Sequence, residues 1–217
     1  MRLYIIIGLV ACLLGPAWAL PEKAYISVPF LCQAPRADWS QPWQDACEEA
    51  AVIMAMDYMM RNRVQGSGSW VLGKEKEILE LVEFQIKKYG GHFDLTAEQA
   101  ARLIRDFYKY NDISVRYDIV VNDIKSELAA GHLVLAPMAG RLLGNPYYTP
   151  PGPAYHYMLF KGYDDRTGEF ITNDMGTRRG RNYRYKYQVA YNAIHDWTGS
   201  KQTIASGRKA VIVIKSK

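Results

Sequence analysis

A run of small and apolar residues constrains this chain more than any other feature. Residues 46–56 read ACEEAAVIMAM, so alanine, methionine and isoleucine dominate two successive helical turns. Asp45 and Glu48 have the spacing of a capping box, which predicts a helix that starts at Ala46. Because so few of the following side chains are polar, this helix is expected to be buried, with small residues near its first turn.

Cys47 would occupy the second position of that helix. Unpaired backbone N–H groups and the positive end of the helix dipole favour a thiolate there. The tryptophans at positions 39 and 43 indicate a partly desolvated surround. The alternative is that Cys47 fills the core, because free cysteine is among the most buried residue types. A third hypothesis is a structural disulfide between Cys47 and Cys32.

The first 19 residues have the organisation of a secretory signal peptide. Met1 and Arg2 give a positive start, an apolar run covers residues 3–14, and Ala17-Trp18-Ala19 is a small-x-small cleavage site. Cleavage after Ala19 would leave residues 20–217 as a single domain. Residues 9–12 also read as a lipoprotein cleavage box with Cys12 acylated. The expected location is therefore the periplasm or the exterior, with membrane anchoring only if Cys12 is lipidated.

A thiolate nucleophile needs a base, and His156 is the best placed of the four histidines. It opens the apolar run 156–163 directly after the stiff loop Pro150-Pro151-Gly152-Pro153. The other three histidines are predicted to cap, pack or lie at the surface; they are His92, His132 and His195.

The strand that begins at His156 runs into a turn of sequence DDRTG and then into a second apolar strand, which predicts a hairpin. Pairing Tyr163 with Glu169 makes His156 and Asp174 diagonal neighbours on one face. A slip of one residue would present Asn173 instead. Either residue type can orient an imidazole ring, and Asp174 is the preferred candidate.

The order of these features resembles the bacteriocin-processing (double-glycine) peptidase-like group, family thirty-nine of the papain-fold cysteine peptidases. The segments that carry the resemblance are VPFLCQ at 28–33, Trp39, CEEA at 47–50, the helix–glycine–strand step at 128–136, the histidine strand at 155–164 and the acidic strand at 171–177. Together they run from about Val28 to Gly176.

The resemblance implies Cys47 as the nucleophile, His156 as the base and Asp174 as the residue that orients the base. Gln33 would help to hold the oxyanion. Gln33 lies fourteen residues before Cys47, whereas papain-type enzymes often place this glutamine nearer, so two others compete for the role: Gln41 and Gln44. The sequence also departs from the group at Met175, where proline is usual.

The implied function is an exported cysteine peptidase that hydrolyses peptide bonds through a thioester acyl-enzyme. A cell-wall peptide hydrolase or an acyltransferase with the same triad is the first alternative, and a non-catalytic binding domain of the same fold is the second. No HExxH, CxxC or calcium-loop spacing occurs, so we expect neither a metal nor another cofactor.

The expected partner is a peptide or protein substrate, including acidic or cell-wall peptides. Residues 178–187 hold five cations and no acid, and Arg178 is predicted to line the cleft together with Trp39 and Tyr148. The alternative is a solvated loop and strand. A formal net charge of +5 falls well short of a nucleic-acid tail, so no nucleic acid is expected, and the chain is expected to be a monomer.

The expected fold is α+β and papain-like. A helix-rich lobe from Ala46 to Tyr110 would pack on an antiparallel sheet, with nucleophile and base on opposing layers. The predicted strands are 114–120, 133–137, 156–163, 169–173 and 210–214, and short helices are predicted at 123–130 and 188–196.

Overall fold

The structure, a computed structural model, describes residues 19–60 and 68–216. All of the predicted signal peptide except Ala19 lies outside these residues, and so does Cys12. Within the described part of the chain, no helix is long and apolar enough to cross a bilayer.

An antiparallel sheet forms one layer, in the strand order β2-β7-β3-β4-β5-β6, with β1 paired to β4. The strands are β1 (Lys23–Tyr25), β2 (Ile113–Tyr117), β3 (Leu133–Met138), β4 (His156–Asp164), β5 (Glu169–Asn173), β6 (Tyr183–Lys186) and β7 (Ala210–Ile214). β3, β4 and β7 are buried along their whole lengths, so the core lies around them. The five predicted strands are present, and β1 and β6 are additional.

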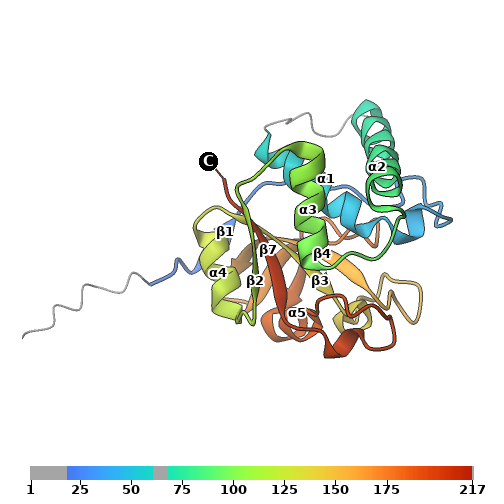
Figure 1. The fold of residues 1–217 in the computed structure, drawn as a ribbon. Coiled ribbons are helices and arrows are strands. Elements are labelled where there is room, and N and C mark those ends of the chain that lie inside the picture. Colours follow the sequence, from blue (N-terminus) through green and yellow to red (C-terminus); the bar gives the residue numbers. More distant parts are fainter. Residues whose placement is uncertain (1–18, 61–67, 217) are drawn as a thin grey trace, which may run out of the picture.

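A helical lobe of α1 (Cys47–Met59), α2 (Gly68–Tyr89) and α3 (Ala97–Tyr108) lies over one side of this sheet, as predicted (Figure 1). α1 packs on β4 and β3, and α3 packs on β2 and β7. Two shorter helices, α4 (Val121–Ala129) and α5 (Tyr187–Ala193), contact the sheet away from the lobe (Figure 1). The result is the expected α+β fold.

The central helix is buried as expected, but its start differs from the prediction. α1 is buried from Cys47 to Asp57 and begins at Cys47, after a 3₁₀ turn, η1 (Trp43–Asp45). Asp45 does not cap it: its Oδ2 accepts a hydrogen bond of 2.6 Å from the Gln41 amide. The predicted capping box is therefore wrong, because η1 carries the Asp45 carboxylate away from the first turn while Glu48 turns inward.

The hairpin of β4 and β5 contains a bulge that the sequence analysis did not anticipate. Leu159 pairs with Asn173, but beyond Lys161 the register moves by one, so that Asp164, not Tyr163, pairs with Glu169. On the side of the bulge nearer to His156, β4 and β5 therefore pair in the register that the sequence predicts. Gly162 lies at this register change and lets β1 approach β4 closely, because a Cβ there would come within 2.4 Å of the Ala24 carbonyl oxygen of β1.

Both cysteines in the described part of the chain are free and buried. The disulfide hypothesis for Cys32 and Cys47 is therefore wrong. The segment that leads to Gln33 is irregular, because β1 ends at Tyr25 and no strand follows before Gln33.

Candidate active site

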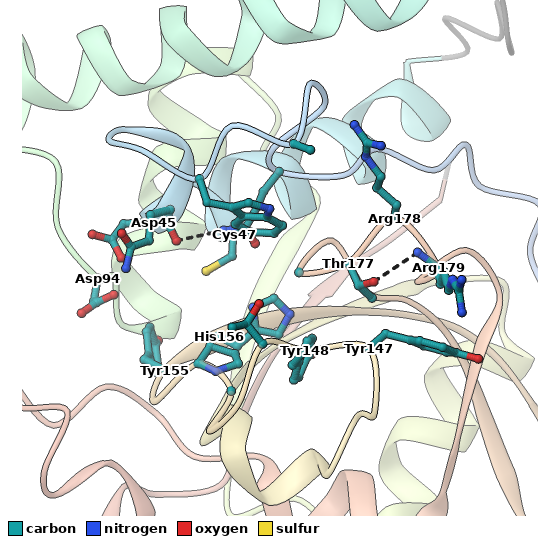
Figure 2. Close-up of a pocket in the computed structure, with 18 residues that line it drawn as sticks. Asp45, Cys47, Asp94, Tyr147, Tyr148, Tyr155, His156, Thr177, Arg178 and Arg179 are labelled. Atoms are coloured by element: carbon teal, nitrogen blue, oxygen red, sulfur yellow. Dashed lines mark hydrogen bonds between the residues drawn. The ribbon is translucent and has the colours of Figure 1, made fainter.

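A cavity of about 730 Å³ opens between the helical lobe and the sheet (Figure 2). It is lined by six of the seven predicted site residues: Gln33, Trp39, Cys47, Tyr148, His156 and Arg178. The seventh, Asp174, is fully buried and contacts His156. Residues more than a hundred positions apart thus meet at one place.

His156 and Asp174 form the contact that the hairpin predicted. The imidazole Nε2 lies 2.9 Å from Asp174 Oδ1, and both side chains are buried. Because Asp174 engages Nε2, Nδ1 is the ring nitrogen left for a partner. The alternative orienting residue, Asn173, points elsewhere and donates to the Pro29 carbonyl at 2.9 Å.

Four groups besides His156 hold the Asp174 carboxylate. Oδ2 accepts hydrogen bonds from Asn145 (3.0 Å), Tyr148 (2.6 Å) and Tyr185 (2.6 Å), and Oδ1 accepts one from the Gly176 backbone N–H (3.0 Å). Burial by itself would raise the pKa of Asp174, but the hydrogen bonds from His156, Tyr148 and Tyr185 outweigh it, and the pKa is lowered. Asp174 is therefore held as a carboxylate.

Asn145 and Tyr185 have roles that the sequence analysis missed. In the sequence, Tyr148 is the one residue of the loop at 145–149 that is predicted to line the cleft, and Tyr185 is one residue of the basic stretch 178–187. Strand alternation offered a signal for Tyr185. Its neighbours at 184 and 186 are charged, so an aromatic residue between them is expected to point to the opposite, buried face, as Tyr185 does.

Gly176 gives the imidazole its space. A Cβ at this position would come within 2.9 Å of His156 Cε1 and 3.1 Å of the Tyr148 ring. The Tyr148 ring itself lies edge-on to the imidazole, with the ring centroids 5.8 Å apart. The ring of His156 is therefore fixed by packing on one side and by Asp174 on the other.

Cys47 faces the same cavity from the first residue of α1 (Figure 2). Its Sγ donates a hydrogen bond of 2.9 Å to Oε2 of the neighbouring Glu48. Burial, followed by the nearby Glu48 carboxylate, raises the pKa of Cys47 well above the ordinary value. The helix terminus does not yield a thiolate in this arrangement, and among the described residues no hydrogen bond joins Cys47 to His156.

The Gln33 amide is committed to the backbone that leads into Cys47. Its Nε2 donates to the carbonyls of Trp43 and Gln44, at 3.0 Å each, while its buried Oε1 has no partner among the described residues. Of the two alternative glutamines, Gln44 lines the cavity and Gln41 does not. The N–H groups of the first turn of α1 also lie here and have no intrahelical acceptor.

Charge differs between the two ends of the cavity (Figure 2). Arg178 and Arg179 line one end, where the Arg179 guanidinium lies 4.8 Å from the centre of the Tyr147 ring. Asp45 and Asp94 line the other end, and Lys201 lies 3.6 Å and 3.5 Å from their carboxylates.

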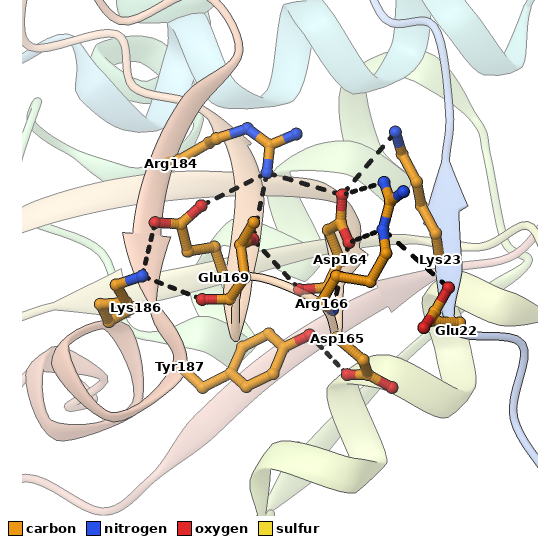
Figure 3. Close-up of polar contacts among 10 residues, drawn as sticks. Glu22, Lys23, Asp164, Asp165, Arg166, Glu169, Arg184, Lys186 and Tyr187 are labelled. Atoms are coloured by element: carbon orange, nitrogen blue, oxygen red, sulfur yellow. Dashed lines mark hydrogen bonds and ion pairs between the residues drawn. The ribbon is translucent and has the colours of Figure 1, made fainter.

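The second half of the basic stretch is structural. Arg184 and Lys186 of β6 lie 3.3 Å and 2.9 Å from the Glu169 carboxylate on the neighbouring strand (Figure 3). The alternative interpretation of this stretch, a solvated strand, is therefore correct for β6. The cations that line the cavity are Arg178 and Arg179.

The described residues hold no group of three or more histidine, cysteine, aspartate or glutamate side chains that could bind a metal ion.

Comparison with known proteins gives one family and a shared fold. A family model described as Peptidase_C39 like family matches residues 25–205. The structure is similar to that of a putative C39-like peptidase from Bacillus anthracis, with a TM-score of 0.54 and 14% identity over 91% of this chain and 100% of that one. Xylellain, a cysteine protease from Xylella fastidiosa, matches with a TM-score of 0.44 and 14% identity, over 92% and 87% of the two chains. No curated protein sequence matches the chain.

Proposed function

The chain belongs to the Peptidase_C39-like family, and on that basis we propose that it is a cysteine peptidase with Cys47, His156 and Asp174 as its triad. The observation that carries the proposal is the buried pair of His156 and Asp174, 2.9 Å apart, in a cavity that Cys47 also lines. A binding domain has no need of a carboxylate that four further hydrogen-bonding groups hold behind an imidazole.

The reaction begins when the Cys47 thiol passes its proton to Nδ1 of His156. The resulting thiolate attacks the carbonyl carbon of a peptide bond, and the carbonyl oxygen becomes an oxyanion. His156 then gives the proton to the leaving amine as the C–N bond breaks, which leaves a thioester on Cys47. Water, deprotonated by His156, attacks the thioester and releases the acid and the thiol.

Asp174 stabilises this cycle by fixing His156. As an ionised acceptor it keeps the proton on Nε2, so that Nδ1 is the basic nitrogen, and it offsets the charge of the imidazolium that forms. Its hydrogen bonds from Tyr148, Tyr185 and Asn145 hold it in place as the charge changes.

The oxyanion would lie against the N–H groups at the start of α1, with the backbone N–H of Cys47 as the first donor. A contribution from Gln33 requires its amide to release one of the two carbonyls that it now binds. Gln44, which lines the cavity, is the alternative donor.

The substrate is a peptide or a protein segment that crosses the cavity, with Trp39 and Tyr148 as contacts. Arg178 and Arg179 favour an acidic side chain or a free carboxylate at their end. Cell-wall peptides carry such carboxylates, so a cell-wall peptide hydrolase or an acyltransferase with the same triad is the second candidate function.

Export is part of the proposal. The signal peptide would be removed after Ala19, or Cys12 would be acylated, and residues 20–217 would act outside the cytoplasm as a monomer. Sequencing of the N-terminus of the protein recovered from its producing cell, with a test for lipid on Cys12, distinguishes these two routes of processing.

The decisive experiment is labelling by a thiol-reactive peptidase inhibitor under reducing conditions. Wild-type protein should carry the adduct on Cys47, and the C47A variant should neither carry it nor cleave a peptide library. Incubation with casein and, separately, with purified peptidoglycan distinguishes a peptidase from a cell-wall hydrolase, because each enzyme releases products from its own substrate. A wild-type protein that cleaves neither substrate and resists labelling would contradict the proposal.

A further inference from the structure

Two carboxyl groups lie buried directly behind the nucleophile, and the reaction as written uses neither of them. Glu48 and Glu49 occupy the second and third positions of α1, and each is 1% exposed. Glutamate is almost never fully buried unless it has a partner. Their contacts therefore need an explanation.

Glu48 divides its two oxygens between the nucleophile and the backbone. Oε2 accepts the hydrogen bond from Cys47 Sγ at 2.9 Å, and Oε1 accepts one from the Leu95 N–H at 3.0 Å. None of the ion pairs in the described part of the chain gives Glu48 a cation. The thiol and one amide are thus its hydrogen-bonding partners.

The Leu95 backbone is itself fixed. Its carbonyl accepts hydrogen bonds from the hydroxyls of Tyr155 (2.5 Å) and Tyr157 (3.1 Å), and both tyrosines are buried. Since Leu95 cannot follow a moving carboxylate, Glu48 is held in one position. The residue that can move is Cys47, whose sulphur turns about a single side-chain bond.

The groups that face Glu48 make its surroundings negative rather than positive. They are Glu49 on α1, Asp94 before α3, Tyr155 just before β4, and Tyr157 in β4. His92 lies beside the other carboxyl, with its Nε2 3.2 Å from Glu49 Oε1; burial by itself would lower the pKa of His92, but Glu49 outweighs burial and the pKa is raised. Burial, followed by Glu49, raises the pKa of Glu48 to about 8.

We propose that Glu48 is a positioning residue that holds the Cys47 thiol proton in the resting protein, so that the sulphur becomes a nucleophile only when it turns from Glu48 toward His156. The inference rests on the proposed function, because Cys47 is its nucleophile. When the sulphur turns, the S–H···O contact breaks, the proton passes from Sγ to Nδ1 of His156, and Glu48 neither gains nor loses a proton. The resting thiol is thereby kept from alkylation and oxidation until a substrate fills the cavity.

A different role for Glu48 predicts the opposite behaviour. If Glu48 were the base that removes the thiol proton, replacing it would make Cys47 less reactive. If it holds the proton, replacing it makes Cys47 more reactive. The sign of one measured change therefore separates the two roles without a known substrate.

The test is the pH profile of alkylation of Cys47 by iodoacetamide in the full chain, followed by mass spectrometry of the Cys47 peptide so that Cys32 is counted separately. Glu48→Gln keeps the size of the side chain and an acceptor for the Leu95 N–H but removes the charge. We expect it to raise the alkylation rate at pH 9, where Glu48 with its pKa of about 8 is ionised, by at least about tenfold and to move the midpoint of the profile down by at least about one pH unit. Glu49→Gln, the neighbouring buried carboxyl without a contact to the thiol, should change both by less.

An E48Q rate that is unchanged or lower overturns the proposal. Should E48Q fail to fold, the wild-type profile decides: we expect its rate to be still rising at pH 9, and a plateau reached by pH 6 overturns the proposal. Peptide cleavage is measured separately. A protein that shows the expected alkylation profile but cleaves nothing contradicts the proposed function and not the role of Glu48.

Discussion

The Tyr148 hydroxyl donates a hydrogen bond of 2.6 Å to Oδ2 of Asp174. The same side chain lines the cavity and lies edge-on to His156. Tyr148 therefore does more than the substrate contact expected of it, because it connects the loop before β4 to the residue that orients the base.

Replacing Tyr148 by phenylalanine should lower kcat by about tenfold to a hundredfold, since a hydrogen bond to a buried charged group contributes roughly 1.5–3 kcal/mol. It should also move the acid limb of the kcat/KM profile to higher pH. The hydrogen bond from Tyr148 lowers the pKa of Asp174, so removing that bond raises this pKa. Steady-state kinetics between pH 4 and 9 measure both effects. Tyr147→Phe is the matched control, because Tyr147 lines the cavity and its hydroxyl makes none of the contacts to Asp174. Equal profiles for Y148F and wild type would refute this role.

Exchanging Arg178 and Arg179 for serine should raise KM for acidic peptides severalfold and leave KM for neutral peptides nearly unchanged. Each exposed charge contributes up to about 1 kcal/mol, and the effect should shrink as salt is added. Arg181→Ser is the control: Arg181 belongs to the same segment, is exposed, and does not line the cavity. If R181S raises KM as much as the double variant, the net charge and not the cavity sets the preference.

Lys161, the residue at the bulge in β4, predicts a pH-dependent stability. Burial lowers its pKa from 10.5 to about 8, and its Nζ contacts the Val28 carbonyl at 3.4 Å. Between pH 8 and 10.5 the unfolded chain binds more protons than the folded one. Burial of the charged Lys161 therefore destabilises the fold fully below pH 8, and this effect is lost as the pH rises toward 10.5.

Lys161→Met should therefore raise the free energy of unfolding at pH 7 by about 1–3 kcal/mol, and the difference from wild type should shrink at pH 9.5. Urea unfolding at both pH values measures it. Lys125→Met is the control and should bring no such gain, because Lys125 lies 2.7 Å from Asp165. A K161M difference that grows with pH would contradict the assignment.

Gly180→Ala should destabilise the protein by about 2 kcal/mol or more and should lower activity as well. A Cβ at Gly180 would come within 1.7 Å of the Asp174 carbonyl oxygen, so the backbone beneath the triad acid must move. Gly73→Ala in α2 meets no atom within 4 Å and should instead stabilise the helix by about 0.5–1 kcal/mol. Thermal unfolding of the two variants should therefore shift in opposite directions.

The sequence predicted those parts of the site that depend on local patterns. The apolar run after Cys47 indicated a buried helix, and alternation in the hairpin made Asp174 and not Asn173 the neighbour of His156. Two predictions that were wrong, the capping box at Asp45 and the uniform register of the hairpin, depend on tertiary contacts. Glycine inside a strand is a signal for a bulge, so Gly162 could have revealed the register change.

Other contacts had no local signal. Glu48 fitted a capping box by spacing, and only the position of Leu95, 47 residues away, shows why its carboxylate turns inward. Asn145 likewise meets Asp174 through the fold of a loop that no periodicity describes. Helix position favoured a thiolate at Cys47 because sequence reasoning could not include the cost of burying that charge.

β6 lies at one edge of the sheet, and its alternation separates two tasks. Tyr185 reaches inward to Asp174, while Arg184 and Lys186 reach outward to Glu169. Sliding this strand by one residue would turn a cation toward the triad acid and leave the phenol in water. The register of a four-residue edge strand thus decides whether Asp174 is held correctly, and the outward ion pairs with Glu169 help to fix that register.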